Sequence, residues 1–163
     1  MKTLLILRHA KSSWGDPSLA DHDRPLNARG KRDAPRMGQL LADQELTPDW
    51  IVSSTAKRAR KTATKVAKAC GFERQVELNG RLYHAYPADY VHVLREVDDQ
   101  HQRVLVVGHN PGLEELVATM AGQYQSMPTA ALAHVVIDID CWSDLQSTST
   151  SRLVSIWLPR ELP

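Results

Sequence analysis

The amino-acid sequence predicts an α/β fold in which helices cover both faces of a mostly parallel sheet. Short apolar runs at residues 4–7 and 104–107 are typical of strands that are buried on both faces. Between such runs lie segments whose apolar residues recur at helical spacing. A chain of 163 residues with 42% hydrophobic residues has the size and composition of one globular domain. We therefore expect a single domain, residues 1–163, built as a three-layer α/β/α sandwich.

The expected strands and helices alternate along the chain. Strands are expected at residues 4–7, 50–54, 75–78, 103–107, 131–139 and 152–158. Helices are expected after residue 30, over residues 55–70, from Pro87 and after Asn110. Pro35 either kinks the first helix or belongs to its first turn. The polar segment 143–151 is expected to be the loop of a hairpin between the last two strands.

Capping residues indicate where two of these helices begin and end. Ser54 or Thr55 is a candidate N-cap for the second helix, and Gly71 follows its last apolar residue as a stop signal. Asn110 is expected to cap the fourth helix, with Pro111 as its first residue.

Composition excludes several classes of protein. A net charge of +1 gives no overall field toward nucleic acid or membrane. The apolar run 4–7 is shorter than the core of a signal peptide, and no stretch approaches a membrane span. Cys70 and Cys141 lack metal-ligand spacing, so we expect reduced structural cysteines, with a free reactive thiol as the alternative. These features predict a cytoplasmic protein that binds neither nucleic acid nor membrane.

Cationic and imidazole side chains follow three of the predicted strands. Arg8 and His9 end the first strand, Arg58 lies in the first helical turn after the second, and His109 follows the strand at 103–107. Open α/β sheets bind ligands beyond the carboxyl ends of their strands. Helix N-termini favour anions there, and a guanidinium fork binds two phosphate oxygens at once. The pattern predicts a phosphate site at this edge of the sheet.

Each of these residues also has a simpler interpretation. Arg8 and His9 alone could be a polar strand end facing solvent, Arg58 one of several surface cations, and His109 a helix cap. Their joint occurrence after separate strands favours the phosphate site over three independent coincidences.

Four motifs resemble those of the histidine phosphatase superfamily, whose fold is phosphoglycerate-mutase-like. They are Leu7-Arg-His-Ala10, Asp23-Arg-Pro-Leu-Asn-Ala-Arg-Gly30, Ser53-Ser-Thr-Ala-Lys-Arg-Ala-Arg-Lys-Thr62 and Val107-Gly-His-Asn-Pro-Gly112. The match keeps its order from the first strand to Gly112, and residues 129–131 give a weaker one. The short chain is most similar to the SixA-type phosphohistidine phosphatases of that superfamily.

The resemblance implies a two-step reaction at His9. His9 would attack phosphorus and become a transient phosphohistidine, which water hydrolyses, while Arg8, Arg58 and His109 hold the phosphate oxygens. The two arginines should lower the pKa of His9 and keep it neutral. Asn110 is included among the phosphate-binding residues. No cofactor and no metal ion are expected.

The substrate class is expected to follow from a missing acid. Phosphomonoesterases of this superfamily usually carry a carboxylate in the segment that corresponds to residues 81–88, and this segment contains none. An alkoxide leaving group needs a proton, whereas imidazole, with a pKa of about 6.5, can carry its own. The absence favours phosphohistidine. Four residues remain candidates to replace the acid: Asp16, Asp21, Tyr83 and His84. Segment 21–25, which contains Asp21, is otherwise expected to be a solvated loop.

Three functions remain open from the sequence. The first is a phosphohistidine phosphatase that acts on a phosphotransfer or phosphorelay protein in signal transduction. The second is a phosphomonoesterase or mutase of small metabolites, and the third a non-catalytic phosphate-binding module. A basic stripe on the second helix is either a solvated face or a docking surface for an acidic partner: Lys57, Arg60, Lys61, Lys65 and Lys68.

Overall fold

The computed structural model describes residues 1–163 and contains one six-stranded mixed sheet with the order β3-β2-β4-β1-β5-β6. Strands β1 to β4 are parallel to one another, and β5 pairs antiparallel with both β1 and β6. The strands are β1 (Lys2–Arg8), β2 (Trp50–Ser53), β3 (Glu77–Leu78), β4 (Arg103–Gly108), β5 (Leu132–Ile137) and β6 (Ser151–Trp157). The sheet is therefore mostly parallel, as the sequence predicts.

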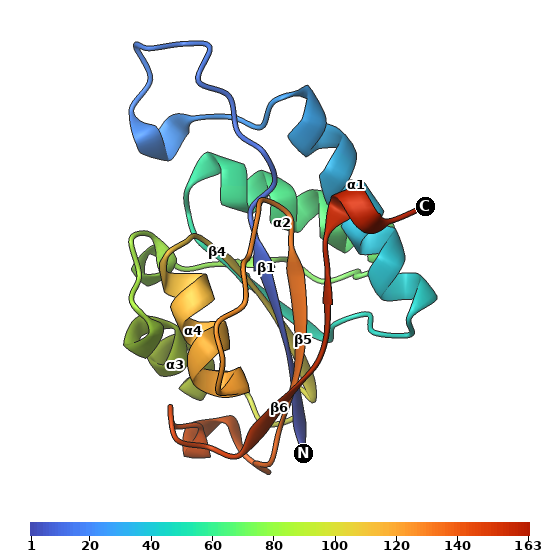
Figure 1. Ribbon diagram of the computed structural model, residues 1–163, viewed down its shortest axis with the longest axis vertical. Helices are drawn as coiled ribbons and strands as arrows, with labels where there is room; N and C mark the ends of the chain where they lie inside the picture. Colours follow the sequence, from blue (N-terminus) through green and yellow to red (C-terminus); the bar gives the residue numbers. More distant parts are fainter.

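Four α-helices cover the two faces of this sheet (Figure 1). They are α1 (Ala28–Asp43), α2 (Lys57–Cys70), α3 (Pro87–Arg95) and α4 (Gly112–Ala121). Helices α1 and α2 pack together on one face, and α3 and α4 lie on the other. This arrangement confirms the predicted α/β/α sandwich and matches the phosphoglycerate-mutase-like fold.

Alternate residues of the central strands supply two separate cores. Leu4 and Ile6 of β1 pack with α3 and α4, whereas Leu5 and Leu7 pack with α1 and α2. Successive side chains of a strand point to opposite faces, so a strand with a layer on each side must be apolar at every position. The continuous apolar runs in the sequence have this cause.

Two helix starts differ from the predictions. Ala56 precedes α2 without a side-chain cap, and Ser54 instead accepts a hydrogen bond from the Ala56 amide at 3.2 Å. Pro111 precedes α4 in a helical conformation, so the expectation that Asn110 caps this helix was wrong. The Asn110 side chain is engaged elsewhere, as described below. Gly71 ends α2 with φ = 81°, as expected for a left-handed stop.

Helix α1 begins earlier than the sequence pattern indicates. Asn27 caps it by accepting a hydrogen bond from the Gly30 amide at 2.9 Å. Pro35 lies inside the helix, beyond its first turn. No helix in the structure combines the length and the apolar character that a membrane crossing requires.

Candidate active site

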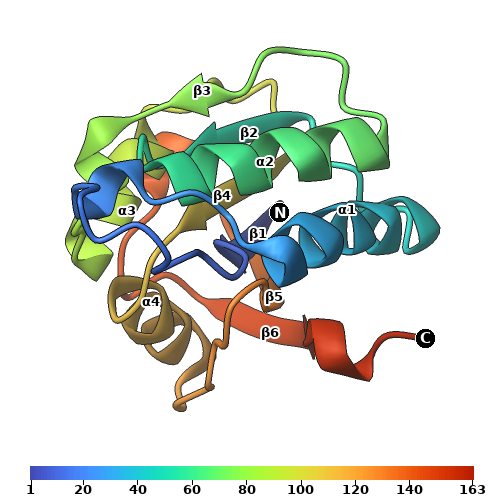
Figure 2. The same ribbon diagram turned by 90° about the horizontal axis from the view of Figure 1, so that it is seen from above.

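The sheet brings the carboxyl ends of β1, β4 and β2 side by side (Figure 2). Arg8 pairs with Gly108 and Ser53 pairs with Val107 in the register of the parallel strands. The chain segments that leave these strands therefore meet at one edge. They place four side chains together, which we call the cradle: Arg8, His9, Arg58 and His109.

The two imidazoles of the cradle face each other. The ring centroids of His9 and His109 are 5.1 Å apart with an angle of 51° between the planes. Both side chains are buried, and the Arg58 guanidinium lies near both rings. The spacing is close enough for both rings to contact one small anion.

The tautomer of His9 follows from the only hydrogen bond that its ring makes. Its Nδ1 lies 2.7 Å from the carbonyl oxygen of Ala10. A carbonyl oxygen only accepts, so Nδ1 carries the proton and Nε2 keeps a free lone pair. The residue is 7% exposed, and burial, assisted by Arg58 and Arg8, lowers its pKa to about 4. The predicted direction is confirmed, but burial contributes more than the arginines.

Arg58 is held by one residue of a distant segment. Its two terminal nitrogens donate to the carbonyl oxygen of Asp21 at 2.7 Å and to the Asp21 Oδ2 at 2.9 Å. The hydroxyl of Thr62 donates to the Arg58 carbonyl at 2.7 Å and accepts from the Ala10 amide at 3.0 Å. Thr62 thus joins α2 directly to the residue that follows His9.

Arg8 is fixed through the segment before β5. It donates to the carbonyl oxygen of Met127 at 3.2 Å, and its Nε is buried without a partner. Glu114 holds this segment by accepting from the Met127 amide at 2.9 Å. Burial lowers the pKa of Arg8, and Glu114 opposes that shift. An unpaired buried N–H beside a cradle of this kind is a donor available to an anion.

His109 is neutral for the same reason as His9. Burial, with further contributions from His9 and Arg58, lowers its pKa to about 3. A hydrogen bond of 2.8 Å joins its Nε2 to the Ser54 hydroxyl, and its Nδ1 is buried without a partner. Sequence reasoning did not single out Ser54 for this contact, because the two residues are far apart in the chain.

Asn110 directs its amide nitrogen into the protein. It donates to the Glu114 Oε1 at 2.9 Å and to the Met127 carbonyl at 2.8 Å. Its remaining oxygen can only accept, and phosphate oxygens need donors. In this structure the residue braces the segment that holds Arg8.

The segment expected to be a solvated loop is exposed at Asp21 and Asp23, but it also contacts the cradle, because Asp21 binds Arg58. Asp21–Asp23 forms a 3₁₀ helix, and Arg24 is buried. Arg24 donates to the Asp21 Oδ1 at 3.0 Å and to the Ser12 hydroxyl at 2.6 Å, and its guanidinium lies 3.3 Å from the centre of the Trp14 ring. Opposite charges three residues apart in a short turn were the only local signal for this pair.

Of the four candidate proton donors, Tyr83 and His84 lie near His109, and Asp21 contacts Arg58. Asp21 is held ionised because hydrogen bonds from Tyr83 and Arg58 lower the pKa of its carboxyl. Tyr83 donates its hydroxyl to the Asp21 Oδ2 at 2.6 Å, and burial together with that bond raises the pKa of Tyr83. The fully exposed Asp16 carboxylate accepts a hydrogen bond from the Ser18 hydroxyl, which lowers the pKa of Asp16. His84 is exposed and contacts Tyr83, with ring centroids 3.9 Å apart and an angle of 41° between the planes.

The structure contains no group of three or more His, Cys, Asp or Glu side chains arranged to hold a metal ion. The positive charge at this site comes from arginines, with Arg58 and Arg24 buried and Arg8 partly buried. The site therefore combines fixed guanidinium groups with neutral imidazoles, a set of groups suited to a phosphate dianion.

Comparisons with known proteins show the family to which the chain belongs. The sequence model of the histidine phosphatase superfamily (branch 1) matches residues 4–86. An uncharacterized protein of Mycobacterium tuberculosis is 33% identical over 165 residues, covering 94% of this chain and 100% of the relative. An uncharacterized chloroplastic protein of Arabidopsis thaliana is 32% identical over 152 residues, covering 88% of this chain and 70% of the relative.

Two solved structures share the fold over nearly their whole length. The SixA protein of Agrobacterium tumefaciens, assigned as a phosphohistidine phosphatase, has a TM-score of 0.82 at 29% identity and covers 97% of this chain and 98% of its own. A protein from Nakamurella multipartitia with the same assignment has a TM-score of 0.85 at 25% identity and covers 97% and 96%.

Proposed function

The chain belongs to the histidine phosphatase superfamily, and from this premise we propose that it is a phosphohistidine phosphatase that acts on a phosphorylated protein. The observation that carries the proposal is the free Nε2 lone pair of His9, which the bond from Nδ1 to Ala10 fixes inside a cradle of guanidinium groups. The similarity to SixA proteins supports the same substrate class.

The first step transfers the phosphoryl group to the enzyme. The Nε2 lone pair of His9 forms a bond to phosphorus, and the P–N bond of the substrate breaks. The electron pair of that bond returns to the substrate ring, which leaves as a neutral imidazole because its other ring nitrogen carries a proton. Arg8 and Arg58 face the charge that spreads over the phosphoryl oxygens, and neutral His109 contacts the same group. Because His9 is already deprotonated at Nε2 above about pH 4, no base is needed to activate it.

The second step releases phosphate. Water adds to the phosphorus of phospho-His9, the P–N bond breaks, and His9 leaves as a neutral imidazole while the water gives up a proton. In this proposal the arginines supply the positive charge, and the reaction is metal-independent.

The engagement of Asp21 and Tyr83 with each other favours phosphohistidine over phosphoesters. The hydrogen bonds to Asp21 keep its carboxyl ionised, and the Tyr83 hydroxyl donates one of these bonds. An alkoxide leaving group needs a proton from the enzyme, whereas an imidazole that is protonated on its other ring nitrogen leaves as a neutral base. A protein substrate is the natural source of phosphohistidine, and a phosphotransfer or phosphorelay domain has the required group.

The proposal is tested by comparing substrates and a nucleophile variant. We expect the wild-type chain to dephosphorylate a histidine-phosphorylated phosphotransfer domain faster than a sugar phosphate. His9→Ala should lower kcat by about 10⁴-fold, and the matched exposed-histidine control His92→Ala should retain activity. Radiolabel trapped on the wild-type enzyme should be acid-labile and alkali-stable. Faster turnover of the sugar phosphate would instead favour a phosphomonoesterase, and full activity of His9→Ala would refute the catalytic role.

A further inference from the structure

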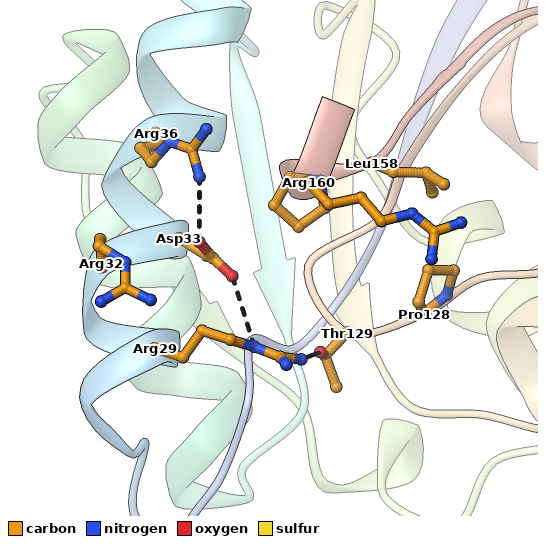
Figure 3. Close-up of a pocket in the computed structure, with 9 residues that line it drawn as sticks. Arg29, Arg32, Asp33, Arg36, Pro128, Thr129, Leu158 and Arg160 are labelled. Carbon is orange, nitrogen blue, oxygen red and sulfur yellow. Dashed lines mark hydrogen bonds and ion pairs between the residues drawn. The ribbon is translucent and has the colours of Figure 1, made fainter. Parts of the chain in front are cut away.

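A pocket separate from the cradle has four arginines among its nine lining residues (Figure 3). Its volume is about 300 Å³, and its walls come from α1, from residues 128–129 and from residues 158–160. Arg29, Arg32 and Arg36 line one side and Arg160 lies across from them, with Asp33 between the first three. We call this cavity the arginine pocket.

The charge of the arginine pocket is unbalanced. The lining includes four arginines and one carboxylate, so it carries a formal charge of +3, whereas the whole chain carries only +1. Asp33 lies 3.2 Å from a terminal nitrogen of Arg36 and 3.9 Å from the Nε of Arg29. The side chains of Arg32 and Arg160 make no hydrogen bond or ion pair. Gathering four like charges costs free energy that a bound anion would offset.

The spacing of these arginines fits an anion longer than one phosphate. Arg29, Arg32 and Arg36 occupy positions i, i+3 and i+7 and therefore share one face of α1. At 1.5 Å per residue, their backbones span roughly 10 Å along the helix axis. The cavity has the volume of about ten water molecules, several times what one phosphate group needs.

The arginine pocket is separate from the cradle but shares a wall with it. The Thr129 hydroxyl accepts from Arg29 at 3.0 Å, on the pocket side. In the same segment, the Met127 carbonyl accepts from Arg8, and the Ala130 amide donates to the His9 carbonyl at 3.0 Å. None of the four cradle residues lines the arginine pocket.

We propose that the arginine pocket is a second, non-catalytic anion site that takes a small compound with a chain of two or more phosphates. Such a chain carries enough negative charge to balance the lining, and each guanidinium fork can bind two of its oxygens. Arg32 and Arg160 are the residues most free to make these contacts. This inference does not depend on the proposed phosphatase activity, because it concerns binding at different residues.

The test is a titration of the ¹⁵N-labelled full chain, carrying His9→Ala to prevent turnover, with inorganic tripolyphosphate. We expect saturable amide shifts at Arg32, Thr129 and Arg160, distinct from those at the cradle. Adding R32Q and R160Q should weaken the binding of tripolyphosphate at the arginine pocket by at least about tenfold, since each substitution removes a charge-assisted contact. These arginines make no hydrogen bonds, so the variant should keep its thermal stability.

A matched control removes the same charge elsewhere. The double variant K61Q and K68Q on the exposed face of α2 should change the pocket affinity by no more than about twofold. An equal loss in both double variants would show that only net charge matters and would overturn the proposal, as would the absence of shifts at the pocket amides. Adenosine triphosphate should bind about as tightly as tripolyphosphate. Binding more than about tenfold tighter would refute recognition through the phosphate chain alone.

Discussion

Arg58 and Asp21 are joined by two hydrogen bonds, one to the backbone carbonyl at 2.7 Å and one to the carboxylate at 2.9 Å. The guanidinium of Arg58 is thereby fixed in plane and direction, although the residues are 37 positions apart. The same carboxylate accepts hydrogen bonds from Arg24 and Tyr83. Asp21 therefore holds together its own segment, residues 21–25, helix α2 and the loop before α3.

Asp21→Asn should lower kcat/KM without unfolding the chain. The variant removes the charge that orients Arg58 and Arg24, and a misplaced guanidinium is expected to cost about 10- to 100-fold in kcat/KM. Steady-state turnover of a histidine-phosphorylated protein measures this loss. Asp23→Asn in the same 3₁₀ helix is the matched control, because Asp23 has only a 3.8 Å contact with His22. Equal activity of the two variants would show that the Asp21 charge does not position Arg58.

Thr62→Val should destabilise the fold at the site. Valine keeps the shape of threonine but leaves the buried Ala10 amide without its acceptor, so the free energy of unfolding should fall by about 1–3 kcal/mol. Urea denaturation measures the change. Thr64→Val is the control on the same helix, where the side chain is exposed and the change should stay within about 0.5 kcal/mol. Similar losses in both variants would point to helix propensity instead.

Glu114→Ala should weaken phosphate binding through Arg8. The carboxylate accepts from the Met127 amide and from Asn110, and the Met127 carbonyl holds Arg8. Without these bonds Arg8 loses its fixed direction, and we expect the inhibition constant of inorganic phosphate to rise by about tenfold. The exposed neighbour Glu115 provides the control E115A. An unchanged inhibition constant in Glu114→Ala would contradict this support role.

The stability of the chain should fall as the pH falls from about 6.5 toward about 4. Burial lowers the pKa of His9 from 6.5 to about 4, so over this range the unfolded chain takes up a proton that the folded chain does not. At pH 5 this costs about 2 kcal/mol of unfolding free energy relative to neutral pH. Comparing urea denaturation at pH 7 and pH 5 for wild type and His9→Asn isolates the effect. The exposed control His92→Asn should behave like wild type, and an equal pH dependence in His9→Asn would refute the burial argument.

Much of the architecture could be read from local patterns. The run at Leu4, Leu5, Ile6 and Leu7 predicted a strand buried on both faces, and the structure shows each residue in one of two cores. The position of His109 after a second such strand predicted that it would approach His9, and the parallel register brings it there. These features depend on period and order, which a sequence displays directly.

The sequence by itself determined the layers, the succession of strands and helices along the chain, and the groups that meet at the end of the sheet. Only the tertiary structure decided how those groups are held. Asp21 accepts a hydrogen bond from Arg58, Thr62 accepts one from the Ala10 amide, and Glu114 fixes the segment that binds Arg8. It also assembled the arginine pocket from three distant segments. Periodicity records which face a residue takes, whereas partners far apart in the chain depend on the path of loops and on burial, which no local pattern encodes.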